Sequence, residues 1–311
     1  MDLKVLISGG NGFLGLYVAE KFLKENFSIT VIDDLSTSKG KNLPENVKFI
    51  KEKVENYNDN EKYNYVLHLA ARPSPEDYIS HPVDTILSNS LGTLKMLEIA
   101  RKGDSIFMYT SSSEVYGDAA VIPTPENYYG YVNPNGIRSC YDEGKRFSEA
   151  LIMAYHREYG LDVRIQRPFN VYGPRIREDG RYGRVIPRFI MQALKNEPLT
   201  VHGDGRQTRS FLYIDDWVNA TWKFLIGKYK GEIINIGSDK EITIIDLARK
   251  IISITNSNSK ILFLPKRDDD PYRRAADLKK VKNLLDWKPK INLDEGLKKT
   301  IEWFKEEKNE G

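Results

Sequence analysis

The chain has few of the residues that build disulfides and metal sites. Cys140 is the single cysteine among 311 residues, which excludes an internal disulfide. The four histidines are scattered and show no spacing typical of a metal site, so we expect no bound metal. A single thiol is compatible with a reducing compartment.

Long apolar runs and blocks of like charge are also missing. No apolar run approaches the roughly 18 residues of a membrane-spanning helix, and strand-like sequence begins by Lys4, which leaves no room for a signal peptide. The formal net charge of +3, with no long Lys/Arg block, does not indicate a nucleic-acid partner. We therefore expect a cytoplasmic protein that binds neither a membrane nor nucleic acid.

The residues that are present predict a folded α/β protein. Hydrophobic residues make up 40% of the chain and charged residues 29%, which is typical of globular proteins, and the length allows a large core. Helices are predicted at 15–25, 84–101 and 139–159, the last with a capping box of Ser139 and Asp142 and an end at Gly160. Strands are predicted in the segments KVLISGG, SITVIDD, VKFIKEK, YNYVLHLAA, SIFMYTSSS and LDVRIQRPF. Alternation of strand and helix implies a doubly wound parallel sheet, the Rossmann fold.

After Phe169 the pattern loosens into Gly- and Arg-rich loops between shorter elements. Helices are predicted near 185–195, 215–226 and 244–255, with a strand at EIINIGS. We expect the first domain to span 1–169 and to be completed by 210–237. A smaller, mainly C-terminal substrate-binding domain is expected at 170–209 and 238–311.

A glycine-rich loop, VLISGGNGFLG, follows the first strand and enters the first helix. Gly9, Gly12 and Gly15 let the backbone approach a pyrophosphate, whose charge then faces the helix N-terminus. Asp33, at the end of the second strand, can accept hydrogen bonds from an adenosine ribose, and Asp34 would repel a 2′-phosphate. The combination favours NAD over NADP, and the alternative is a plain tight turn.

Tyr141 and Lys145 lie four residues apart and share one face of a predicted helix. The ammonium can favour the phenolate, which a tyrosine needs when it takes a proton from a hydroxyl. The spacing alone is a weak signal, because Tyr17 and Lys21 repeat it inside the first helix. The stretch YTSSSEVYG ends the fifth strand, where strand tips face the ligand crevice, and offers Ser112 to the reacting hydroxyl.

These motifs, together with RPFNVYGPR, resemble the extended short-chain dehydrogenase/reductase family that acts on nucleotide sugars. The stretches VNPNGIRSCYDEGKR, SEVYGD, TRSFLYIDD, INIGS and LLDWKPKI are similar to its UDP-glucuronate decarboxylase branch, and the similarity spans nearly the whole chain. The resemblance implies conversion of UDP-glucuronate to UDP-xylose with NAD as the cofactor. C4 is oxidised, CO₂ leaves the 4-keto acid, and C4 is reduced again.

The resemblance implies a role for each catalytic candidate. Tyr141 is the base, Lys145 holds the nicotinamide ribose and tunes Tyr141, and Ser112 binds the sugar 4-hydroxyl. Glu114, directly or through water, protonates C5. The late acidic loop supplies an arginine that we align to Arg274, with Arg273 as the alternative. The implied catalytic residues are Tyr141, Lys145, Ser112, Ser113, Glu114 and Arg274.

The resemblance also implies the residues that bind cofactor and substrate. Asn170 and Arg209 would bind the diphosphate, and residues 199–202 would flank the uracil. The implied cofactor-binding residues are Gly9, Asn11, Gly12, Phe13, Leu14, Gly15, Asp33, Ala70, Asn89, Tyr141, Lys145 and Pro168. The implied substrate-binding residues are Tyr78, Asn170, Arg184, Val185, Arg209 and Arg274.

Three departures from the branch leave other functions open. Arg72 places a cation near the sugar pocket, Ala275 and Ala276 replace Lys-Pro, and Lys53 stands where an adenine-binding aspartate is usual. One alternative is a C4 epimerase of a UDP-hexose or UDP-uronate, and another is a non-catalytic NAD-sensing protein of the same fold. The helices at 84–101 and 139–159 resemble the pair through which relatives dimerise, so a homodimer is expected.

Overall fold

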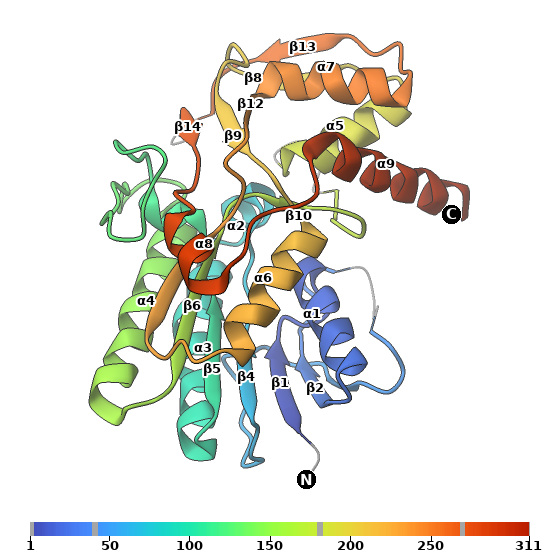
Figure 1. Ribbon diagram of the computed structural model, residues 1–311. Helices are drawn as coiled ribbons and strands as arrows, with labels where there is room; N and C mark the ends of the chain where they lie inside the picture. Colours follow the sequence, from blue (N-terminus) through green and yellow to red (C-terminus); the bar gives the residue numbers. More distant parts are fainter. Residues whose placement is uncertain (1–2, 39–42, 179–182, 268–270, 311) are drawn as a thin grey trace.

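A seven-stranded parallel sheet forms the centre of the computed structural model, which describes residues 3–38, 43–178, 183–267 and 271–310 (Figure 1). The strand order is β11-β6-β5-β4-β1-β2-β3, so the order reverses between β1 and β4. A crevice opens beside the carboxyl ends of the strands at such a reversal. The strands are β1 (Lys4–Ser8), β2 (Ser28–Ile32), β3 (Lys48–Ile50), β4 (Tyr65–His68), β5 (Ile106–Thr110), β6 (Val163–Pro168) and β11 (Glu232–Ile236).

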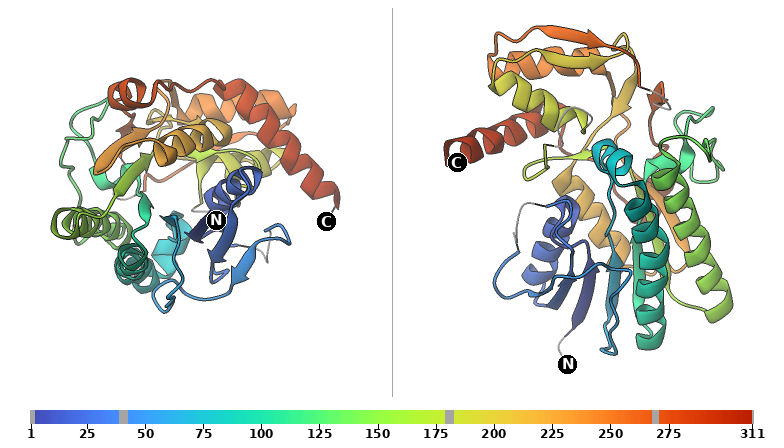
Figure 2. Two further views of the ribbon diagram at one scale, coloured as in Figure 1. Left: turned by 60° about the horizontal axis from the view of Figure 1, so that its bottom comes forward. Right: turned by 180° about the vertical axis from the view of Figure 1, so that it is seen from behind.

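Alternate strand residues face opposite layers of the core, as the period of a strand requires. Val5 and Ile7 of β1 pack in one hydrophobic cluster with α1 (Phe13–Lys24) and α6 (Ile214–Ile226). Leu6 packs in the other cluster with α3 (Pro82–Gly103) and α4 (Ser139–Tyr159). The two helix layers lie on opposite faces of the sheet (Figure 2). The predicted doubly wound α/β fold is confirmed.

Most elements after β6 gather over the carboxyl ends of the sheet strands, opposite the chain's N-terminus (Figure 1). The exceptions include α6, which packs on the sheet, and β11, which returns to the sheet and pairs in parallel with β6. The division into two domains remains a prediction. The further elements are α2 (Pro75–Ser80), η1 (Ser113–Tyr116), β7 (Val171–Tyr172), α5 (Val185–Leu194), β8 (Leu199–His202), β9 (Thr208–Ser210), β10 (Leu212–Tyr213), β12 (Glu241–Thr243), α7 (Ile244–Thr255), β13 (Ile261–Leu264), β14 (Arg273–Arg274), α8 (Lys279–Leu285) and α9 (Leu293–Glu310).

Helix α4 has the predicted bounds but not the predicted cap. It begins at Ser139, and its N-cap is Arg138, which makes no side-chain capping hydrogen bond. The expected capping box is wrong because Ser139 already belongs to the first turn. Gly160 ends the helix at φ +67°, the left-handed region that glycine tolerates. Helix α3 is longer than predicted, because a proline starts its first turn at Pro82.

Gly144 allows α3 and α4 to pack closely. A Cβ added at this glycine would lie 3.1 Å from the Cβ of Asn89 on α3. Asn89 is fully buried, and its amide donates to the carbonyl oxygen of Thr85 at 2.9 Å. The glycine weakens the helix but sets the distance between the two helices.

Candidate active site

A pocket of about 980 Å³ lies between the carboxyl ends of the sheet strands and the elements above them. Of the predicted site residues, Asn89 does not line it, because that side chain is buried between α3 and α4. A contact between Asn89 and the cofactor therefore remains a prediction. The predicted residues that line the pocket are Gly9, Asn11, Gly12, Phe13, Leu14, Gly15, Asp33, Ala70, Tyr78, Ser112, Ser113, Glu114, Tyr141, Lys145, Pro168, Asn170, Arg184, Val185, Arg209 and Arg274.

The glycine loop has the shape that a dinucleotide pyrophosphate needs. Gly9 has φ +70°, and a Cβ there would lie 2.6 Å from the backbone nitrogen of Ala70. A Cβ on Gly15 would lie 2.2 Å from the carbonyl oxygen of Gly9. Helix α1 starts at Phe13, two residues earlier than predicted, so Phe13 and Leu14 supply the N–H groups of the first turn. The residues present fit a pyrophosphate at this turn.

Asp33 lies where β2 ends and braces the glycine loop. Its Oδ2 accepts the N–H of Asn11 at 3.0 Å, and its Oδ1 accepts the N–H of Leu35 at 2.9 Å. Burial raises the pKa of Asp33, and these two N–H donors oppose that shift. The carboxylate faces the same pocket as the glycine loop, in the position predicted for a ribose acceptor.

Tyr141 and Lys145 both reach the pocket from α4, and the lysine lies over the tyrosine ring. The Lys145 Nζ donates to the carbonyl oxygen of Thr110 at 2.8 Å and lies 5.8 Å from the centre of the Tyr141 ring. Burial lowers the pKa of Lys145 to about 7, although the charge of Glu149 opposes this. Burial raises the pKa of Tyr141 well above its ordinary value, opposed by a hydrogen bond with Ser112. The tuning of Tyr141 by Lys145 remains a prediction for the protein with its cofactor.

Glu114 lines the pocket and is held by two arginines. Arg138 donates to one carboxylate oxygen and Arg274 donates to the other. Burial raises the pKa of Glu114, but the charges of Arg138, Arg274 and Arg209 outweigh it and lower the pKa to about 2. Arg273 instead pairs with Glu241 at 2.6 Å and does not line the pocket. The alignment to Arg274 therefore agrees with the arrangement of the side chains.

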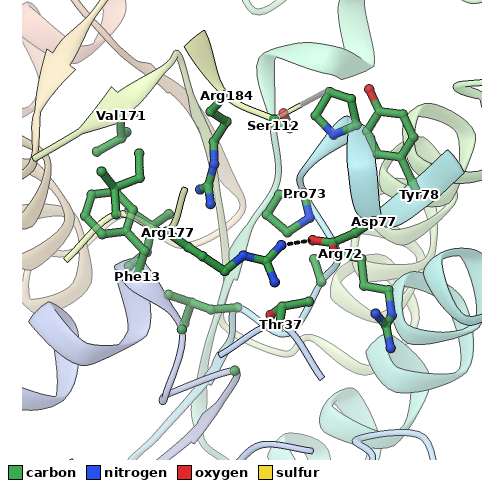
Figure 3. Close-up of a pocket in the computed structure, with 18 of the residues that line it drawn as sticks. Phe13, Thr37, Arg72, Pro73, Asp77, Tyr78, Ser112, Val171, Arg177 and Arg184 are labelled. Atoms are coloured by element: carbon green, nitrogen blue, oxygen red, sulfur yellow. Dashed lines mark hydrogen bonds and ion pairs between the residues drawn. The ribbon is translucent and has the colours of Figure 1, made fainter. Parts of the chain in front are cut away.

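Tyr78, from α2, stacks on the ring of Tyr141 with 5.6 Å between ring centres. Asn170 has φ +43°, and its amide donates to the carbonyl oxygen of Ser210 at 2.9 Å. Arg209 is buried on the neighbouring strand β9. Arg184 points into the same pocket, which Asn170 and Arg209 also line (Figure 3). Cations and amides thus converge where the resemblance places a diphosphate.

An ion pair that the sequence did not reveal crosses the pocket. Arg177 extends from the segment after β7 and donates to Asp77 of α2 at 2.6 Å (Figure 3). Phe13 and Thr37 line the same pocket (Figure 3). Asp77 and Arg177 are 100 residues apart, so no local pattern could have paired them.

Arg72 lines the pocket, and its place near the sugar remains a prediction. Its guanidinium lies 3.8 Å from Asp84, which also pairs with Lys53 at 3.1 Å. The two unusual cations are therefore joined through one carboxylate on α3. Arg138 was also missed, although its position three residues before Tyr141 is a signal that could have drawn attention to it.

The glycine turn at the sheet reversal and the tyrosine–lysine pair beside it define a dinucleotide-dependent enzyme of the α/β class. The chain belongs to the NAD dependent epimerase/dehydratase family, whose sequence model matches residues 5–237. NAD is thus the cofactor that the glycine loop and Asp33 fit.

Relatives with this architecture include decarboxylases and epimerases. UDP-glucuronic acid decarboxylase 1 of Danio rerio is 40% identical over 98% of this chain and 73% of its own length. UDP-glucuronic acid decarboxylase 3 of Arabidopsis thaliana is 41% identical over 95% of this chain and 87% of its own length.

Solved structures give a similar picture. A UDP-glucose 4-epimerase from Thermotoga maritima, with UDP-glucose, superposes with a TM-score of 0.90 at 30% identity, covering 98% of this chain and 99% of that chain. A UDP-glucuronic acid 4-epimerase from Bacillus cereus, in complex with UDP-glucuronic acid and NAD, gives 0.88 at 28% identity with the same coverage.

Neither a membrane span nor a metal cluster is found in the part of the chain that the structure describes. No helix there combines the length and the apolar composition needed to cross a membrane. Among the same residues, no group of three or more His, Cys, Asp or Glu side chains could hold a metal ion.

Proposed function

We propose that the protein decarboxylates UDP-glucuronate to UDP-xylose with NAD as a cofactor that is regenerated in each turnover. The observation that carries the proposal is the identity of about 40% over 98% of the chain to a protein named UDP-glucuronic acid decarboxylase. The contact between Glu114 and Arg274 in the pocket supports it, because an arginine beside a carboxylate can exchange that partner for the carboxylate of a substrate.

The reaction begins at the sugar 4-hydroxyl. Tyr141 takes the hydroxyl proton, Ser112 holds the oxygen by a hydrogen bond, and Lys145 orients the cofactor ribose. Bound NAD supplies reversible hydride transfer at C4, which is first oxidised to a ketone and finally reduced to an alcohol.

The ketone makes the sugar a β-keto acid, so its carboxylate can leave as CO₂. The electron pair of the broken bond is stored as an enolate, and C5 then accepts a proton. Arg274 holds the carboxylate before it leaves, and Glu114 faces the carbon that must be protonated. Tyr141 returns its proton to the C4 oxygen at the end.

A C4 epimerase is the second candidate, because epimerases superpose on this chain over nearly its whole length. Incubation of the protein with UDP-glucuronate and NAD distinguishes the two. CO₂ together with UDP-xylose supports the decarboxylase, and UDP-galacturonate without CO₂ supports the epimerase. If no nucleotide sugar is turned over, both enzymatic proposals are wrong.

A homodimer through α3 and α4 is also part of the proposal. Both helices expose large apolar side chains, and Val83 and Phe147 are 66% and 51% exposed. The others on this surface include Ile86, Leu91 and Leu94. Packing of α3 and α4 against their copies would bury them as a four-helix bundle. Sedimentation at the mass of a monomer would refute the dimer.

A cytoplasmic location, suggested by the single cysteine, is tested by cell fractionation.

A further inference from the structure

Arg138 joins two buried carboxyl groups beside the reacting tyrosine. It donates to Glu114 of η1, and its Nε lies 3.6 Å from Oδ2 of Asp142 on α4. The side chains of Arg138, Asp142 and Glu114 are 13%, 8% and 17% exposed. The other oxygen of Asp142, Oδ1, is buried and has no hydrogen-bond partner among the described residues. The Arg138 guanidinium thus contacts two carboxyl groups, and Oδ1 of Asp142 has no hydrogen-bond partner among the described residues.

The charges around this pair make the two carboxyl groups unequal. Burial and the negative charge of Glu114 raise the pKa of Asp142 to about 7, although Arg138 and Arg274 oppose the shift. Glu114 is ionised, because the two arginines hold its carboxylate. Below the pKa of Asp142 the pair therefore holds a single proton, and that proton is on Asp142. The titratable and charged groups around Asp142 are Tyr78 on α2, Glu114 on η1, Arg138, Cys140 and Tyr141 at the start of α4, and Arg274 on β14.

The proposed decarboxylation, on which this inference rests, consumes one proton in each turnover. When CO₂ leaves the carboxylate, the electron pair remains on the sugar, and C5 must gain a proton to become the product carbon. The proton that Tyr141 takes from the 4-hydroxyl returns to the same oxygen, so it cannot supply C5. The proton must come from solvent, and an ionised Glu114 has none to give.

We propose that Asp142 and Glu114 share one proton, which rests on Asp142 until the substrate carboxylate draws Arg274 away from Glu114. Glu114 then keeps one cation in place of two and takes up a proton as the Asp142 O–H gives one up. The proton crosses through water, because Arg138 lies between the two carboxyl groups. The Glu114 O–H next breaks as the C5–H bond forms from the enolate electrons. Asp142 is reprotonated from solvent. Asp142 is thus a positioning residue that acts through Glu114.

The variant Asp142→Asn tests this assignment because the amide keeps the size of the side chain but has no transferable proton. In single turnovers on UDP-glucuronate we expect CO₂ release to continue while absorbance of bound NADH accumulates, since C5 protonation is delayed. We expect kcat to fall about 10-fold or more. In the unchanged protein kcat should decline above about pH 7, where the shared proton is lost, and the variant should lack this decline.

Glu143→Gln is the matched control, because Glu143 is the next residue on α4 and its side chain is 37% exposed. It should behave as the unchanged protein. An Asp142→Asn enzyme with unchanged kcat and pH profile overturns the proposal. So does a slower enzyme with neither NADH accumulation nor a changed profile, which would make Asp142 structural.

If the Asp142→Asn variant does not fold, a measurement on the unchanged protein still tests the proposal. Infrared spectroscopy without substrate should show the band of a protonated carboxyl that disappears near pH 7. Absence of the band overturns the shared proton. If the protein releases no CO₂ from UDP-glucuronate but shows the band, the decarboxylase proposal fails and the carboxyl pair stands.

Discussion

Lys145 donates a hydrogen bond to the carbonyl oxygen of Thr110, 2.8 Å away, and thereby ties the first turns of α4 to the end of β5. The bond fixes the lysine beside Thr110, which precedes Ser112 by two residues in the sequence. It also leaves a charged amine in a buried place, which burial disfavours.

The buried amine makes stability depend on pH. Burial lowers the pKa of Lys145 from 10.5 to about 7, so between these values the unfolded chain binds a proton that the folded chain lacks. Stability therefore rises with pH through this window. We expect Lys145→Met to raise the melting temperature of the ligand-free protein most at pH 7 and progressively less toward pH 10. Lys102→Met, at an exposed position, serves as the control, and an equal gain at every pH would contradict the prediction.

Glu114→Gln should slow the steady-state turnover of UDP-glucuronate far more than it weakens NAD binding. The amide keeps the size of the side chain but cannot transfer a proton to C5, so we expect about a 10²-fold lower rate of UDP-xylose formation. Steady-state measurement of UDP-xylose and titration with NAD compare the two effects. If both suffer equally, Glu114 has only a structural role.

The Arg177–Asp77 pair crosses the pocket, so a bound dinucleotide must pass it to leave. Removal of the guanidinium in Arg177→Ala should speed NAD release about 10-fold, the effect expected for the loss of one charge-assisted hydrogen bond. Asp77→Asn should have a similar but smaller effect. The control is Arg206→Ala, because the Arg206 side chain is 80% exposed and pairs loosely with Asp204 at 3.9 Å. Equal NAD release rates in all four proteins would show that the pair does not retain the cofactor.

Asp33→Asn should weaken NAD more than NADP. The substitution removes the charge that a ribose hydroxyl would use and one of the two backbone contacts of the carboxylate. We expect about a 10-fold weaker NAD complex and a smaller change for NADP, which the carboxylate repels. Fluorescence titration with both dinucleotides measures the ratio, and a parallel loss for both would assign Asp33 to the loop alone.

Glu149 neutralises a buried arginine behind the site. Its carboxylate accepts from Arg167 at 2.5 and 2.9 Å and from the hydroxyl of Ser111 at 2.5 Å. Glu149→Gln leaves the guanidinium without its counter-charge and should cost about 3 kcal/mol in the free energy of unfolding. Denaturant titration measures this, with the exposed Glu158→Gln as the control. A cost below about 0.5 kcal/mol, the usual range for surface substitutions, would contradict it.

Local patterns in the sequence predict the sheet because each strand carries its own signal. The seven predicted strands appear where the β-branched runs stand, and α4 has the predicted bounds from Ser139 to Tyr159. The glycine loop and Asp33 could be placed for a similar reason, since both lie within one strand–helix–strand unit.

The charge pairs inside the pocket could not be predicted from the sequence in this way. Glu114 meets Arg274 across 160 residues, and Asp77 meets Arg177 across 100. Such contacts depend on how the elements over the carboxyl ends of the strands pack on the sheet. No short-range sequence pattern encodes that packing. The Ser139 cap failed for a related reason, because a single extra helical residue moves a cap out of register.

β11 gives the fold an unusual dependence on the later half of the chain. Residues 232–236 pair with β6. During synthesis β6 therefore remains an unpaired edge strand until that stretch has emerged from the ribosome. Proteolytic nicking at any one point between β6 and β11 would likewise free neither half as a self-sufficient fragment. Because β11 must pair with β6, we expect two co-expressed fragments to complement each other and neither fragment to fold alone.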